Sequence, residues 1–146
     1  MTEPFGHGRL IVYQKGMRFV ALRRNLLDRL TRRVSACDHL ERAAESIQVN
    51  IAHGSSTTSA QERMMYLGHA NGSALECAAC LDVLAAKHLI AAGDTLPGKL
   101  LLAEIAAFCW LCTKPPQAVS ENLPLDTTHE REICSITRTW TSINCH

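Results

Sequence analysis

The sequence predicts an all-α protein, an antiparallel up-down-up-down four-helix bundle with a mobile C-terminal tail. The 146 residues are 47% hydrophobic but only 5% aromatic, and alanine and leucine dominate, which favours helix packing over a β-sandwich. This length is enough for a single domain with a sizeable core. Apolar residues also recur every three or four positions in four segments that turns separate. We therefore expect the bundle over residues 1–114 and a polar tail over residues 115–146.

The first helix is expected over residues 10–34. At 100° per residue, its apolar side chains fall on one arc that would face the core, and they are Val12, Phe19, Leu26, Leu27, Leu30 and Val34. Arg23 projects from the middle of this arc. If it is buried, its guanidinium needs a carboxylate or a backbone carbonyl as partner.

The second helix is expected over residues 35–53. Gly54 follows its last turn, and a glycine there takes the left-handed conformation at low cost, so we expect it to end the helix. The polar residues 55–58 indicate a turn. Ser59 and Glu62 then match the capping box that begins a further helix.

The third helix is expected over residues 60–92, closed by Gly93 and Asp94. Its middle is built from small side chains, namely Gly68, Ala70, Gly72, Ser73, Ala74, Cys77, Ala78 and Ala79. Each interior glycine costs about 1 kcal/mol relative to alanine. Close approach of another helix or subunit would offset that cost.

The fourth helix is expected over residues 97–113, with Pro97 in its first turn. Lys114 and two prolines then stop it. Beyond them the periodicity is lost, apart from a possible short helix over residues 129–136, which is why a mobile tail is predicted.

Positive charge is concentrated in the first helix and the start of the second. Residues 9–42 carry nine Arg and Lys but only three Asp and Glu. Five of these cations form a line beside the apolar arc, and they are Lys15, Arg18, Arg29, Arg32 and Arg33. Such a line suits the phosphates of structured RNA or DNA, which bind by counterion release without a base-specific motif. The alternative is a solvated helix face whose charge only keeps the protein soluble.

The seven cysteines are expected to be reduced, buried thiols, because their number is odd and no export signal accompanies them. A zinc site at Cys77, Cys80, Cys109 and Cys112 is the weaker alternative. Such pairs usually lie on turns, whereas these lie on predicted helices. No nucleophile, base and acid can be assembled from the sequence, and no phosphate-binding glycine loop is present. We therefore expect no enzymatic activity, no metal and no cofactor.

A soluble, cytoplasmic protein without a membrane partner is the expected setting. Residues 1–9 do not resemble a signal peptide. The longest apolar run, residues 100–112, contains Glu104 and is too short to span a bilayer.

Two segments resemble a known family of four-helix bundles. The matching residues are Arg42-Ala43-Ala44, Ser46-Ile47, Asn50-Ile51-Ala52 and Gly54, followed by Ala70, Gly72-Ser73 and Glu76. The pattern is similar to that of proteins encoded in 23S ribosomal RNA intervening sequences and, more distantly, of accessory variability proteins of retroelements. The chain departs from it at His53, where the family commonly has glutamate, and at Gln48, where it has proline.

This resemblance implies a homo-oligomer, with a ring-like pentamer favoured, and in the related branch binding of nucleic acid. Arg42, Asn50 and Glu76 match polar positions of the family pattern. We expect structural roles for them: Asn50 caps or bonds across the hairpin of the second and third helices, and Glu76 pairs with Arg42. Two functions therefore remain open, an oligomeric module that binds structured nucleic acid through its first helix, and a protein-interaction scaffold that does not.

Overall fold

The computed structural model describes residues 5–113, and these residues contain four α-helices, a short 3-10 turn and no strand. The elements are η1 (Gly6–Arg9), α1 (Ile11–Leu27), α2 (Ser35–Ser56), α3 (Ala60–Ala86) and α4 (Ala92–Thr113). The prediction of an all-α four-helix bundle is confirmed. The tail predicted over residues 115–146 lies outside the described residues.

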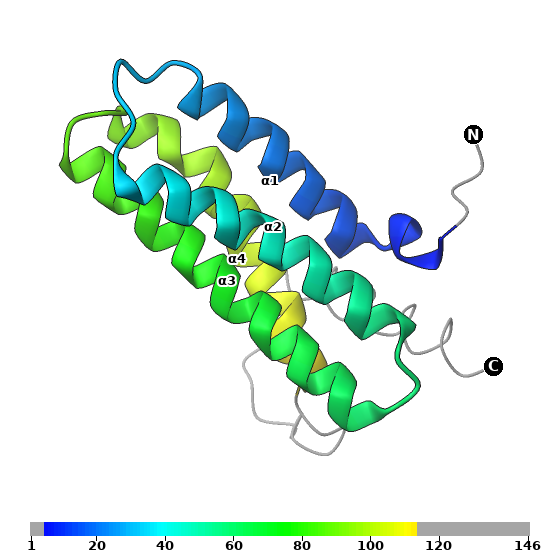
Figure 1. The fold of residues 1–146 in the computed structure, drawn as a ribbon. Coiled ribbons are helices and arrows are strands. Elements are labelled where there is room, and N and C mark those ends of the chain that lie inside the picture. The colour runs from blue at the N-terminus through cyan, green and yellow to red at the C-terminus, as the bar shows by residue number, and fades with distance from the viewer. Residues whose placement is uncertain (1–4, 114–146) are drawn as a thin grey trace, which may run out of the picture.

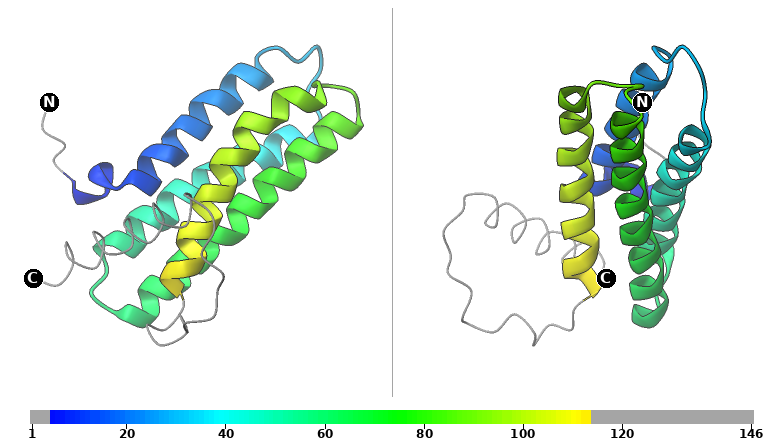
Figure 2. Two further views of the ribbon diagram at one scale, coloured as in Figure 1. Left: turned by 180° about the vertical axis from the view of Figure 1, so that it is seen from behind. Right: turned by 90° about the vertical axis from the view of Figure 1, so that its left-hand side faces the viewer.

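The four helices lie side by side, and the chain reverses direction at each connection (Figure 1). Each helix packs against its two neighbours, so that α1, α2, α3 and α4 form a closed ring of contacts. Figure 2 shows the same arrangement from behind and from one side. The contacts of α3 with α2 and α4 are the most extensive, while α1 is held by fewer.

One hydrophobic core fills the space between the helices. Its largest fully buried side chains are Phe19, Leu40, Ile47, Ile51, Leu67, Leu81, Leu84, Leu102 and Ile105. Each such side chain contributes about 1.5–3 kcal/mol by leaving water. All four helices supply them, as the periodicity of the sequence predicts.

The first helix ends at Leu27, seven residues before the predicted boundary at residue 34. The chain tightens there, because the amide nitrogens of Arg29 and Leu30 donate to carbonyls only three residues back. Leu30 and Val34 still pack against the core from the connection. The apolar periodicity therefore ran past the true end of the helix.

Gly54 lies inside α2 and does not end it, since the helix continues to Ser56. No described glycine has a positive φ. A Cβ at Gly54 would lie 3.5 Å from atoms of Tyr66 and Leu67 on α3, an ordinary van der Waals contact, so this position faces α3 and has room for a methyl group. The helix ends where the hydroxyls of Ser55 and Ser56 donate to carbonyls three residues back.

The predicted start of α3 is correct. Ser59 is its N-cap, and its hydroxyl oxygen accepts a hydrogen bond of 3.3 Å from the backbone nitrogen of Glu62. The Glu62 carboxylate accepts from the hydroxyl of Thr57 at 2.7 Å. The cap therefore also ties down the turn before the helix.

The connection of α3 and α4 comes earlier than predicted. α3 ends at Ala86, and His88 takes a left-handed conformation with φ 55° that reverses the chain. Gly93 and Asp94, expected to close α3, lie instead in the first turn of α4, where the Asp94 carboxylate suits the positive end of the helix. Pro97 lies five residues after the start of α4 at Ala92. A proline this close to the N-terminus of a helix removes few intrahelical hydrogen bonds, so the helix tolerates it.

The position of Gly54 gives a prediction about stability. Because its backbone is helical and a Cβ would make only ordinary contacts, Gly54→Ala should leave the free energy of unfolding unchanged or raise it by up to about 1 kcal/mol. Urea unfolding followed by circular dichroism measures this. A loss of more than about 1 kcal/mol would instead indicate the left-handed helix cap.

Candidate functional site

The five predicted phosphate-binding cations do not form one line along a helix. Lys15 and Arg18 lie on α1, whereas Arg29, Arg32 and Arg33 lie in the connection of residues 28–34. The predicted line depended on a continuous helix to residue 34. Its geometry is lost where α1 ends.

Three of the five cations are engaged by carboxylates of other elements. Lys15 pairs with Glu104 of α4, and Arg29 lies 3.2 Å from a carboxylate oxygen of Asp94. Arg33 pairs with Glu41 and Asp38 of α2. The hydrogen bond to Glu41, and to a smaller extent the one to Asp38, raises the pKa of Arg33. These side chains join α1 and its connection to α2 and α4.

Arg18 and Arg32 remain exposed, and neither has a carboxylate within 4.0 Å among residues 5–113. Of the predicted basic set, these two are the cations left to meet an external phosphate. Residues 11–27 contain no Asp or Glu, so α1 itself supplies no negative charge next to Arg18.

Arg23 is buried, with 7% of its surface exposed, and a carboxylate lies at ion-pair distance from its guanidinium without a hydrogen bond. Its Nη1 lies 3.8 Å from Oε1 of Glu41. Glu41 also pairs with Arg33, so one carboxylate of α2 serves both arginines. Glu41 thus connects α2 both to α1 and to the connection that follows α1.

Asn50 forms its hydrogen bonds within α2. Its amide nitrogen donates to the backbone oxygen of Ser46 at 2.8 Å and to the Ser46 hydroxyl at 3.1 Å. The hydroxyl of Ser73 on α3 donates to the same Ser46 oxygen at 2.9 Å. Asn50 thus reaches across the hairpin only through Ser46, a relay that sequence reasoning missed.

Glu76 and Arg42 form no ion pair with each other within residues 5–113, and each contacts His39 instead. The Nδ1 atom of His39 is 3.5 Å from the Glu76 carboxylate and 3.5 Å from the Arg42 guanidinium. His39 and Glu76 are about half exposed. This contact connects α2 to α3 at the surface.

The four cysteines of the alternative zinc site are free thiols in the described part of the chain. Burial raises the pKa of Cys77 and of Cys109 to about 12 and that of Cys112 to about 11, so these groups are neutral thiols at pH 7. The thiol of Cys77 donates to the backbone oxygen of Leu40 at 3.9 Å. Within residues 5–113, no three His, Cys, Asp or Glu side chains are arranged to hold a metal ion.

One strip of the outer surface of α3 is uncharged, and it contains Gly68 and Gly72 of the small-residue segment that the sequence indicated. Six of its exposed residues fall within an arc of about 80° at 100° per residue, bordered by exposed Glu76 and Asp82, and they are Met65, Gly68, Gly72, Leu75, Ala79 and Val83. We call this set the α3 face. Leu75 is 60% exposed. A Cβ built at Gly68 or Gly72 would meet no atom within 4 Å, so neither glycine is explained by packing inside the described chain.

The outer face of α4 is also uncharged. Leu96, Leu100, Ala103, Ala107 and Trp110 follow one another at spacings of four, three, four and three, again within an arc of about 80°. We call this set the α4 face. Leu100 is 58% exposed and Trp110 is 55% exposed. The face forms a ridge with large side chains near both ends.

Charges on these two helices are gathered at the seams with their neighbours. Glu76 contacts His39 of α2, Asp82 pairs with Lys99 across the α3–α4 seam, and Glu104 pairs with Lys15 of α1. The outer surface of α2 differs, with exposed Asp38, His39, Arg42 and Glu45. The ion pairs therefore border the α3 face and the α4 face and leave both free of charge.

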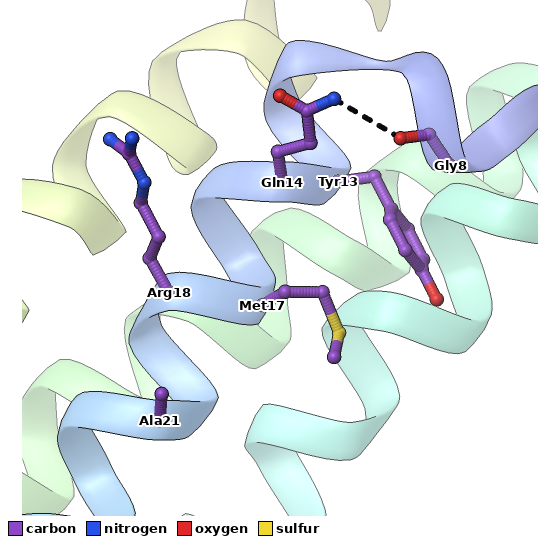
Figure 3. A pocket seen from close by; sticks show the side chains of 6 residues that line it. All are labelled: Gly8, Tyr13, Gln14, Met17, Arg18 and Ala21. Carbon is purple, nitrogen blue, oxygen red and sulfur yellow. Dashed lines mark hydrogen bonds between the residues drawn. The ribbon is translucent and has the colours of Figure 1, made fainter. Parts of the chain in front are cut away.

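A shallow hollow of about 580 Å³ lies over the outer surface of α1 and η1 (Figure 3). It is lined by Gly8, Tyr13, Gln14, Met17, Arg18 and Ala21. Gln14 donates to the backbone oxygen of Gly8 at 3.2 Å, which holds η1 against the helix. Arg18 is the only charged side chain of this lining set.

By length and composition alone, α4 is one described helix that would be able to cross a membrane. Core helices of soluble bundles share this property, and α4 supplies Leu102 and Ile105 to the core.

The fold and its surfaces define a small all-α bundle with uncharged outer faces on two adjacent helices. The family model of the 23S rRNA-intervening sequence proteins matches residues 8–108. The chain therefore belongs to this family, as the residues around Arg42–Gly54 and Glu76 indicated. No curated protein and no solved structure matches the chain.

Proposed function

We propose that the protein is a non-enzymatic helical scaffold that assembles with copies of itself through the outer surfaces of α3 and α4. The observation that carries this proposal is the α3 face, with two exposed glycines in the middle of a long helix and no charged side chain between them and Val83 on the same arc.

The energetics of α3 support this proposal. Two helical glycines cost about 1 kcal/mol each relative to alanine, and no contact inside the described chain offsets this cost. Exposed Leu75, Met65 and Val83 add apolar surface that water disfavours. A helix of another subunit packed on the α3 face would offset both costs, because glycines permit close approach of two backbones. Five subunits is the number that the sequence resemblance favours.

A single charge placed in the α3 face tests the proposal. Leu75→Asp should convert the assembly to monomers, because the carboxylate would lose its water in the subunit contact. Native mass spectrometry and light scattering after gel filtration measure the mass. The matched control is Val49→Asp on α2, where Val49 is 53% exposed but is surrounded by polar residues, and this variant should keep the wild-type mass. A monomeric wild-type protein would contradict the proposal.

Binding of structured nucleic acid is the second candidate function. It is favoured by the exposed guanidinium groups of Arg18 and Arg32, which have no carboxylate partner among the described residues. Assembly would repeat these charges around the oligomer and multiply their effect on a polyanion.

Charge reversal at these two arginines tests the second candidate. Arg18→Glu/Arg32→Glu should weaken retention on structured RNA and reduce the slope of log affinity against log salt by about 2 per subunit in contact. The control is Arg24→Glu, which reverses an exposed arginine already paired with Asp28. Equal retention of the double variant and the wild-type protein would eliminate binding through this surface.

A further inference from the structure

We infer that α1 is a releasable arm, which opens as a unit under the control of salt and leaves α2, α3 and α4 packed as a three-helix core. In the closed bundle α1 lies along α2 and α4 (Figure 1). Opening would bare the sides of these two helices that α1 covers. The inference is independent of the proposed self-assembly, because no residue of α1 belongs to the α3 face or the α4 face.

The buried stripe of α1 offers little apolar surface to the bundle. Its residues recur at spacings of four, three, four and three, and they are Val12, Gly16, Phe19, Arg23 and Leu26. Two of these five positions, Gly16 and Arg23, add no apolar side chain to the core. By comparison, α3 buries seven residues, and each of them belongs to the hydrophobic core. Removing α1 from the bundle therefore exposes less apolar side chain than removing α3.

Polar groups in the seam between α1 and α2 lack partners in the closed bundle. Both amide atoms of Gln48 on α2 are buried without a hydrogen-bond partner among the described residues, and so are Nε and Nη1 of Arg23. The Gln48 amide faces α1, since a Cβ built at Gly16 would lie 2.0 Å from its Nε2 atom. Buried polar atoms without a hydrogen bond destabilise the closed form, and opening of α1 would return them to water.

Ion pairs oppose this opening. Within residues 5–113, each ion pair that joins α1 or its connection to another helix has its cation on the α1 side and its carboxylate on α2 or α4. The pairs are Lys15–Glu104, Arg23–Glu41, Arg29–Asp94, Arg33–Asp38 and Arg33–Glu41. Most of these side chains are in contact with water, so salt weakens the attraction between them. Salt concentration should therefore determine how often α1 opens.

Hydrogen exchange followed by mass spectrometry tests the inference helix by helix. In about 0.1 M salt, protection factors in residues 11–27 should be lower than those in residues 62–84 by about tenfold or more, because α1 opens without global unfolding. In about 1 M salt, exchange of α1 should become about tenfold faster, while exchange of α3 stays the same.

Two substitutions on α2 should shift the opening in opposite directions. Gln48→Met replaces the buried amide with an apolar side chain of similar length, so exchange of α1 should become about tenfold slower. Glu41→Gln removes the carboxylate that pairs with Arg23 and Arg33, so exchange of α1 should become about tenfold faster. The matched control is Glu45→Gln, the same change at an exposed residue of α2 that forms no ion pair within the described chain, and it should leave the exchange unchanged.

Two results would overturn the inference. If α1 and α3 have the same protection and the same response to salt, the bundle opens only as a whole. If Glu41→Gln and Gln48→Met are folded by circular dichroism but leave exchange of α1 at the wild-type rate, the seam does not control α1. Native mass spectrometry of the same samples reads self-assembly separately. A monomeric protein whose α1 opens first would contradict the proposed scaffold and support the releasable arm.

Discussion

Close packing of α2 against α3 is the contact on which the rest of the bundle depends. Small side chains of both helices are buried in the core, namely Ala43 and Ala44 of α2 and Ala70 and Ala74 of α3. Gly54 extends the close approach to the end of the hairpin, where Tyr66 and Leu67 lie against it. The hairpin therefore forms the half of the bundle against which α4 and α1 pack.

This arrangement also determines where charge can lie. Helices that pack closely meet at seams, and carboxylates at the seams find cations on the neighbouring helix, as Asp82 does with Lys99 and Glu104 with Lys15. Exposed ion pairs of this kind contribute at most about 1 kcal/mol each to stability. Their larger consequence is the pattern that remains, two uncharged outer faces on α3 and α4 beside the polar outer surface of α2.

The sequence was sufficient for the fold class, the number of helices and the N-cap at Ser59, because periodicity and capping are local properties. The sequence was insufficient where tertiary contacts determine where a helix ends or which charges pair. Leu30 and Val34 continue the helical period but pack from a connection, and Gly54 resembles a helix end but lies inside α2, facing α3. Pairing of Arg29 and Arg33 with acidic residues also depends on how the elements meet in space. For the α3 face, the sequence indicated only a run of small residues. The structure shows which of these residues are exposed on the outside of the bundle.

The most direct test of self-assembly through uncharged faces is the mass of the wild-type protein, free of nucleic acid, as salt is raised. Sedimentation in about 1 M salt, where the Debye length is about 3 Å, suppresses association between exposed charges but leaves apolar contacts intact. The oligomer should keep its full mass under these conditions. Dissociation into monomers at high salt would show that charged surfaces such as those around Arg18 hold the subunits together, and would contradict the account.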